Sequence, residues 1–151
     1  MKSLLNPGHR SALMKRLSQV RPDTPRRWGR MSAHGMICHL SDSFLGCLGD
    51  RPIWDRSNFL RRTVMRFGAC TVPLPWPKGY RTSPEVDQER DGTPPGDFAT
   101  DLENLNALVD TFVDRLDPET MRHPVFGLLS QAEWGRWAYR HVDHHTRQFG
   151  L

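Results

Sequence analysis

Two histidines near the C-terminal end of the sequence have the spacing of metal ligands on a helix. His141 and His145 are four residues apart in the stretch YRHVDHHTRQFG, so a helix would place both on one face. The same face carries Trp134 and Ala138, which predicts that it points into the core. Buried imidazoles need polar partners, and a divalent metal ion that accepts a lone pair from each ring would supply them.

A third ligand would have to come from another helix, and His39 is the best candidate. It lies in MICHLSDSF, beside an apolar stripe that is expected to be buried. Three protein ligands with one open position are typical of catalytic zinc sites. His144, which is three residues after His141, could instead be one of the ligand pair. Asp42, His144 and Gln148 are candidates for orienting the ligand rings from outside the coordination shell.

Other histidines of the seven in the chain have weaker claims. His34 and Cys38 are four residues apart and form a rival half-site, although a cysteine is more often a small buried hydrophobe. His9 and His123 are expected in loops or at the surface. The sequence therefore favours one metal site built from two helices.

The periodicity of apolar residues predicts the elements that position these side chains. We expect long helices at residues 7–20, 33–48, 98–116 and 130–148, with a shorter helix at 55–67. Asn6, Ser32 and Ser130 are good N-caps, and Glu133 completes a capping box. Four long helices predict an all-α protein, with residues 1–151 forming one four-helix bundle domain.

A long Pro-rich loop is expected between the short helix and the third long helix. Residues 70–97 contain six prolines and three glycines, which exclude a helix and disfavour a central strand. A loop of this length in a compact domain is often functional, so it is expected to shape a pocket. Its residues Trp76, Tyr80 and Arg81 are candidate substrate contacts. A second, short connector at 123–129 is expected to turn at Gly127.

The composition limits the classes of function. Its content of 37% hydrophobic and 25% charged residues is typical of an ordinary globular domain. Its three cysteines form no C-x-x-C pair, and it has no signal peptide and no long apolar run, so we expect a soluble cytoplasmic protein without a membrane partner. A net charge of +4 without a nucleic-acid-binding motif argues against nucleic acid as a partner. A homodimer is the candidate assembly, since small bundles often pair about a two-fold axis.

The motifs together resemble the DinB-like, or YfiT-like, superfamily of metalloenzymes. The resemblance is carried by WGRMSAHGMICHLSDSF at 28–44, by HPVFGLLSQAEWGRWAYRHVDHHTRQFGL at 123–151 and by the Pro-rich VPLPWPKG between them. The resemblance is strongest for a subgroup of this superfamily that is defined only as a domain of unknown function. It implies a four-helix bundle with one divalent metal held by His39, His141 and His145 at one end of the core.

The resemblance also implies a class of chemistry. Related members resemble S-transferases and maleylpyruvate isomerases that use low-molecular-weight thiols such as bacillithiol or mycothiol. We therefore expect a metal-dependent thiol S-transferase or hydrolase acting on a small molecule, with zinc or nickel as the first choice of metal and iron or manganese as alternatives. The alternatives are a stress-related interaction protein and a non-catalytic bundle stapled by the metal, with His144, Asp42 or Asp143 as fourth ligand.

Overall fold

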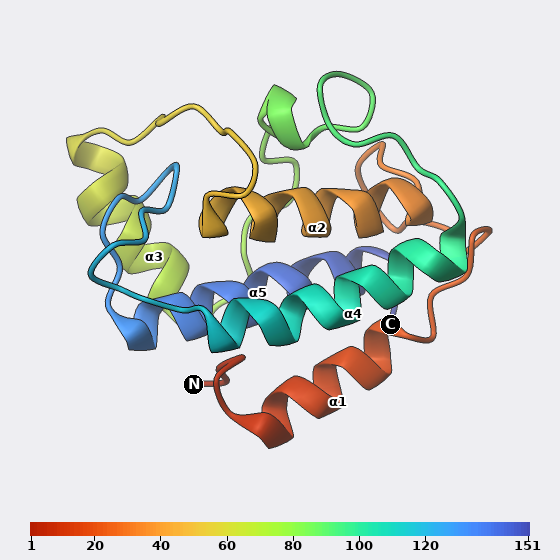
Figure 1. Ribbon diagram of the computed structural model, residues 1–151, viewed down its shortest axis with the longest axis horizontal. Coiled ribbons are helices and arrows are strands. Elements are labelled where there is room, and N and C mark those ends of the chain that lie inside the picture. Colours follow the sequence, from red (N-terminus) through yellow and green to blue (C-terminus); the bar gives the residue numbers. More distant parts are fainter.

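The computed structural model describes residues 1–151 and is all-α, as the sequence predicts (Figure 1). A π-helical turn, η1 (Arg61–Met65), runs directly into α3, and a 3-10 turn, η2 (Pro84–Val86), interrupts the long loop. The two sides of the 123–129 connector are joined by a single isolated bridge between His123 and Gly127. The α-helices are α1 (Pro7–Leu17), α2 (Ala33–Leu48), α3 (Arg66–Cys70), α4 (Phe98–Asp114) and α5 (Gln131–Gln148).

The four long helices begin at side-chain caps. In each case the capping side chain accepts a hydrogen bond from the backbone N–H three residues later, and this satisfies one of the free donors of the first turn. The caps are Asn6, Ser32, Asp97 and Ser130. At α5 the box is complete, because Glu133 also accepts from the backbone N–H of Ser130.

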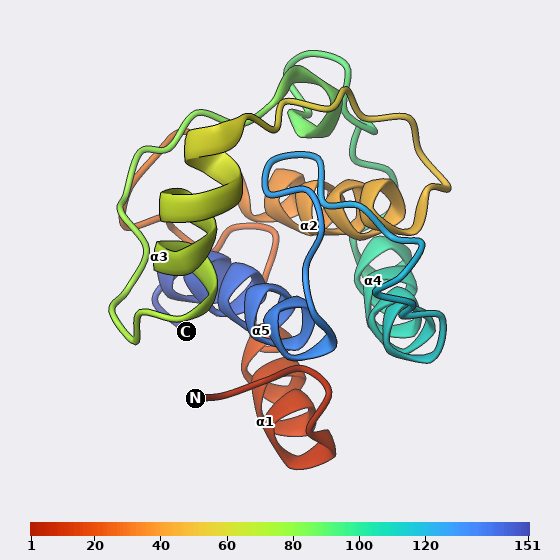
Figure 2. The same ribbon diagram turned by 90° about the vertical axis from the view of Figure 1, so that its left-hand side faces the viewer.

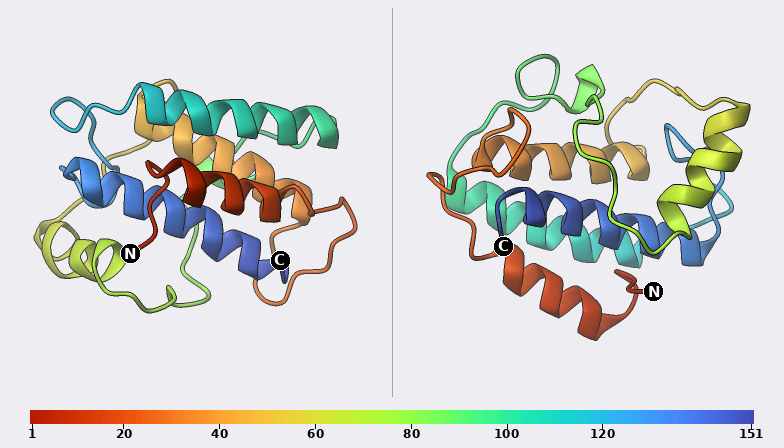
Figure 3. Two further views of the ribbon diagram at one scale, coloured as in Figure 1. Left: turned by 90° about the horizontal axis from the view of Figure 1, so that it is seen from below. Right: turned by 180° about the vertical axis from the view of Figure 1, so that it is seen from behind.

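The helices pack in a continuous series. Helix α5 lies between α1 and α2, and α2 packs most extensively against α4 (Figure 2). Helix α1 runs along α5 on the side away from α2, and α3 covers the N-terminal half of α5 (Figure 3). Aromatic rings fill the space between these helices: Phe44 of α2 lies 5.0 Å from Phe112 of α4, and Phe112 lies 6.0 Å from Trp134 of α5. This packing sets α2 and α5 side by side.

Several helix boundaries differ from those predicted. Helix α1 ends at Leu17 rather than at residue 20, and α4 ends at Asp114 rather than at 116. The short helix expected at 55–67 begins later, because the side chain of Asn58 caps the N–H of Arg61. Some of its apolar residues are left uncovered, and Phe59 and Val64 are 85% and 64% exposed, whereas Cys70 at its end is buried in the core. None of the helices has the length and apolarity that crossing a membrane requires.

The loop from residue 71 to residue 97 crosses from α3 past α5 and α2 before it enters α4 (Figure 3). It is long and almost free of regular structure, as its prolines and glycines predict. Its second half is attached to α2, which makes it a wall of the region between α2 and α5.

Candidate metal centre

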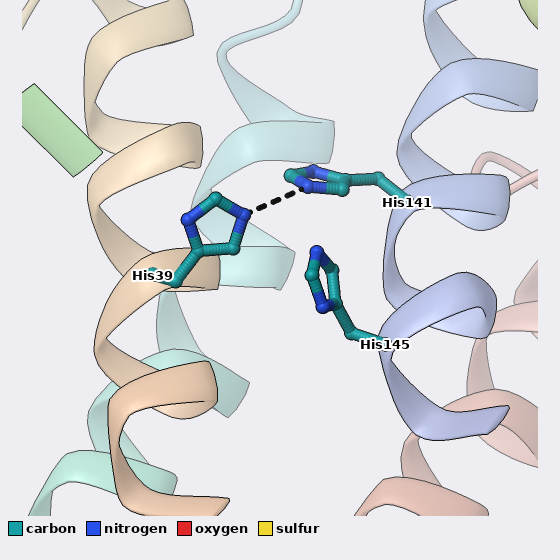
Figure 4. Close-up of side chains that lie close together, drawn as sticks. All are labelled: His39, His141 and His145. Atoms are coloured by element: carbon teal, nitrogen blue, oxygen red, sulfur yellow. Dashed lines mark hydrogen bonds between the residues drawn. The ribbon is translucent and has the colours of Figure 1, made fainter. Parts of the chain in front are cut away.

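Helices α2 and α5 bring three histidines to one point (Figure 4). His39 comes from the middle of α2, and His141 and His145 come from successive turns of α5. One nitrogen from each ring lies within 4.8 Å of the others, and Nε2 of His39 is 3.2 Å from Nε2 of His141. The three residues singled out from the sequence therefore form a group that could hold a metal ion.

The separation of these two nitrogens matches the geometry of a metal site. Imidazole nitrogens bind zinc at about 2.0–2.1 Å, so two of them on one tetrahedral ion stand about 3.3–3.4 Å apart. The separation of 3.2 Å between His39 and His141 is close to that tetrahedral edge. The two rings fit a shared metal ion without rearrangement of α2 against α5.

Hydrogen bonds on the outer side of two rings determine which nitrogen is free. Nδ1 of His39 donates to the carbonyl of Val86 at 2.7 Å. Nδ1 of His145 is 2.9 Å from Oε1 of Gln148, whose own Nε2 donates to the carbonyl of Trp28. Since the amide oxygen can only accept, the His145 ring is the donor. Both rings therefore direct an Nε2 lone pair to the centre, as metal-binding histidines do.

The ring of His141 is held by aromatic packing instead. It lies 5.3 Å from Trp137 and 6.0 Å from Trp76, measured between ring centroids. Its Nδ1 atom is buried and has no hydrogen-bond partner. The only polar contact of this ring is thus the one that Nε2 makes toward His39.

Burial keeps the three rings neutral. Desolvation lowers the pKa of His39 below its ordinary value of 6.5. Burial, reinforced by the neighbouring histidines, lowers the pKa of His141 and of His145 well below that value. Neutral imidazole is the form that binds metal ions, so near pH 7 the site does not have to release protons to do so.

Asp42 makes its hydrogen bonds away from the rings. Its buried carboxylate accepts from the backbone N–H of Thr93 at 2.8 Å and from the Thr93 hydroxyl at 2.7 Å, and it pairs with Arg51 at 3.3 Å. These contacts attach the long loop to α2. The group that orients His39 is the Val86 carbonyl of that loop. A backbone oxygen carries no signal in the residue types, so the sequence could not indicate it.

His144 lies beside the three-histidine group rather than in it. Its ring is 5.3 Å from His145, 5.8 Å from Trp28 and 6.0 Å from Trp76. The structure therefore brings His145, and not His144, to His39 and His141. The i,i+4 pair lies on one face of α5, whereas the ring of His144 packs among the aromatic side chains next to it.

His123 lies in a loop, as predicted, and is buried there. The connector that holds it leads directly into α5. Its Nδ1 accepts from the backbone N–H groups of Val125 and Phe126, and its ring stacks on Phe126 at 4.6 Å. His9 differs from that prediction, because it lies half-buried on α1, where its Nδ1 accepts from the N–H of Ser3. Neither histidine belongs to the metal-ligand group.

A cavity of about 1330 Å³ adjoins the three histidines, which form part of its lining. Trp76, Tyr80 and Arg81, the candidate substrate contacts, all lie on its wall. Trp76 is fixed there, because its Nε1 donates to the Ala69 carbonyl at 3.1 Å and the guanidinium of Arg140 lies 5.6 Å from its ring. Tyr80 and Arg81 are exposed at the wall. A small molecule in this cavity would have access to the metal ligands.

Comparison of the chain with protein-family models, with curated proteins and with solved structures finds no match. The geometry and chemistry of the site are therefore the basis for assigning a function.

Proposed function

We propose that this chain is a DinB-like metalloenzyme, in which α1, α2, α4 and α5 form a four-helix bundle and His39, His141 and His145 hold one divalent metal ion. The observation that carries the proposal is the 3.2 Å approach of the Nε2 atoms of His39 and His141. At that separation two imidazoles fit one metal ion, and the outer nitrogens of His39 and His145 are already engaged as donors.

The surroundings favour an open coordination position over a closed structural site. The candidate fourth ligands make other contacts: Asp42 bonds to Thr93, and Asp143 pairs with Arg16 at 2.6 Å and with Arg147 at 3.0 Å. His144 packs against Trp28 and Trp76. None of them belongs to the group of converging ligand atoms. The cavity, rather than a fourth side chain, adjoins the three nitrogens. This favours a catalytic metal site over a site in which the metal only cross-links the helices.

The reaction class proposed is thiol S-transfer or hydrolysis on a small organic molecule. A bound divalent ion, zinc or nickel in the first instance, would lower the pKa of a thiol or water at the open position. The chain supplies a cavity that receives the apolar part of the substrate. Trp76 packs against His141 at 6.0 Å between ring centroids, and Arg81 offers a positive charge at the wall.

Metal content of protein purified without an affinity tag tests the proposal. The variants His39→Ala and His145→Ala are expected to contain one equivalent of metal fewer per chain than the parent. His144→Ala and His9→Ala are matched controls that remove a histidine outside the group, and they are expected to keep the parent's content. If all four variants bind as much metal as the parent, the three-histidine site is refuted.

Activity assays with the metal-loaded parent then distinguish an enzyme from a non-catalytic bundle that the metal only stabilises. Screens that pair low-molecular-weight thiols with electrophiles, and esters or amides with water, are expected to show turnover that His39→Ala lacks. A metal-loaded parent whose melting temperature falls on chelation, but which has no metal-bound water that exchanges with solvent, would support the non-catalytic alternative.

A further inference from the structure

A second group of metal-binding side chains lies between α2 and α4. His34 and Cys38 are one turn apart on α2, and Asp101 faces them from the first turn of α4. Oδ2 of Asp101 is 2.7 Å from Nε2 of His34 and 3.8 Å from Sγ of Cys38. The three ligand atoms lie within 4.8 Å of one another. This group is distinct from the three histidines, because His39 faces α5 whereas these side chains face α4.

We propose that His34, Cys38 and Asp101 form a second metal site, for a thiophilic divalent ion such as zinc, that ties α2 to the beginning of α4. The donor set of thiolate, imidazole and carboxylate suits zinc, whereas magnesium and calcium prefer oxygen ligands alone. Cys38 would release its thiol proton to solvent as the ion binds. The site is independent of the proposed enzymatic function.

The distances agree with such an ion after a small adjustment. A sulfur at about 2.3 Å and an oxygen at about 2.1 Å from one tetrahedral ion stand about 3.6 Å apart. Sγ of Cys38 and Oδ2 of Asp101 are separated by 3.8 Å. Nε2 of His34 would have to move away from the carboxylate by about 0.6 Å to reach the usual edge of about 3.3 Å. The side chain of His34 is 19% exposed, so part of it faces solvent and is not enclosed by packing.

Two features of the surroundings support the site. The backbone N–H of Gly96 donates to Oδ2 of Asp101 at 2.9 Å, which holds the carboxylate toward the other ligands. A cavity of about 310 Å³ adjoins the group and is lined by Cys38, Asp101 and Asn104. It offers an entry path and room for a water as the fourth ligand.

The position of the group gives the site a role in the fold. Gly96 and Asp101 flank the point where the long loop ends and α4 begins. The same loop is held by the bonds of Thr93 to Asp42, and it carries the Val86 carbonyl that orients His39. An ion that bridges Cys38 and Asp101 would therefore secure the loop at its α4 end.

Cobalt(II) is the probe that distinguishes the two sites, because only a thiolate ligand gives an intense near-ultraviolet sulfur-to-cobalt charge-transfer band. Chelator-treated full-length protein, kept reduced with a phosphine, is titrated with cobalt(II). The parent and His39→Ala are both expected to develop the band, since it does not depend on the three histidines. Cys38→Ser is expected to lose the band and to bind one equivalent fewer of cobalt.

Two other thiols provide the controls. Cys70→Ser changes a buried thiol on α3, and Cys47→Ser changes one on α2 that lines the large cavity; both are expected to keep the band. Asp101→Asn, which retains the shape of the side chain, is expected to weaken cobalt binding at this site at least tenfold, and it serves if Cys38→Ser does not fold. Absence of the band in the parent, or its persistence in Cys38→Ser, would overturn the second site.

Discussion

Nδ1 of His39 donates a hydrogen bond to the backbone carbonyl of Val86 at 2.7 Å, so a candidate metal ligand on α2 is oriented by the long loop. The bond leaves Nε2 of His39 as the free lone pair, which faces His141. Partners of this kind commonly fix the tautomer of a metal-binding histidine. The loop is therefore part of the candidate metal centre as well as the wall of the cavity.

The attachment of the loop to α2 is the first prediction. Thr93→Val removes the hydroxyl that donates to the buried carboxylate of Asp42 at 2.7 Å. Because a hydrogen bond to a buried charge is lost, the free energy of unfolding is expected to fall by about 1.5–3 kcal/mol in urea titrations. Thr111→Val is the control, since the exposed Thr111 donates only to the carbonyl of Ala107 within α4. Equal stability of Thr93→Val and the parent would contradict this role.

The second prediction concerns Gln148. Gln148→Leu removes the oxygen that accepts from Nδ1 of His145 at 2.9 Å. Loss of such a partner typically lowers metal affinity by about 10–100-fold, and this range is expected in competition titrations with a chromogenic chelator. Gln131→Leu, at the exposed beginning of α5, is expected to leave the affinity unchanged. An affinity that is identical in the two variants would argue against ring orientation by Gln148.

The third prediction is a dependence of stability on pH that originates at His123. Burial lowers the pKa of His123 from its ordinary value of 6.5 to about 3. The unfolded chain therefore binds this proton first, so the contribution of His123 to stability is complete above pH 6.5 and is lost as the pH falls toward 3. Between pH 7 and pH 5, metal-free protein is expected to lose about 2 kcal/mol of unfolding free energy through this residue.

Urea titrations of the parent and of His123→Asn at both pH values measure this loss. The asparagine oxygen can still accept the backbone N–H groups of Val125 and Phe126, so the turn is expected to survive. The other buried histidines act in the same direction in both proteins, and the difference between the two isolates His123. A variant as acid-sensitive as the parent would show that His123 does not carry the effect.

The fourth prediction compares two glycines. A Cβ at Gly135 of α5 would lie 2.3 Å from Oγ of Ser3 and 2.8 Å from Cγ of Leu5, because the N-terminal segment passes close to the helix there. Gly135→Ala is expected to lower the unfolding free energy by about 1–3 kcal/mol through overpacking. Gly68 of α3 has open space around its Cβ position, so Gly68→Ala is expected to raise stability by about 0.4–1 kcal/mol. Thermal or urea unfolding of both variants checks the opposite signs.

The sequence alone determined the features that depend on residues within about four positions of each other. Asn6, Ser32 and Ser130 were identified as helix caps, since a cap bonds to the N–H three residues later. The i,i+4 spacing of His141 and His145 placed both on one face of α5. The prolines of residues 70–97 indicated the long loop in the same way, because each removes a backbone donor locally.

Only the tertiary structure decided which groups meet across the chain. His39 and His141 are 102 residues apart, and Val86 is 47 residues from His39, so their contacts depend on how α2, α5 and the loop pack. The tertiary structure also decided that His145 rather than His144 joins the group and that Asp101 meets Cys38. It likewise decided that His123 is buried. Local periodicity carries no information on such distant pairs, because their proximity follows from the packing of whole helices rather than from the spacing of neighbours.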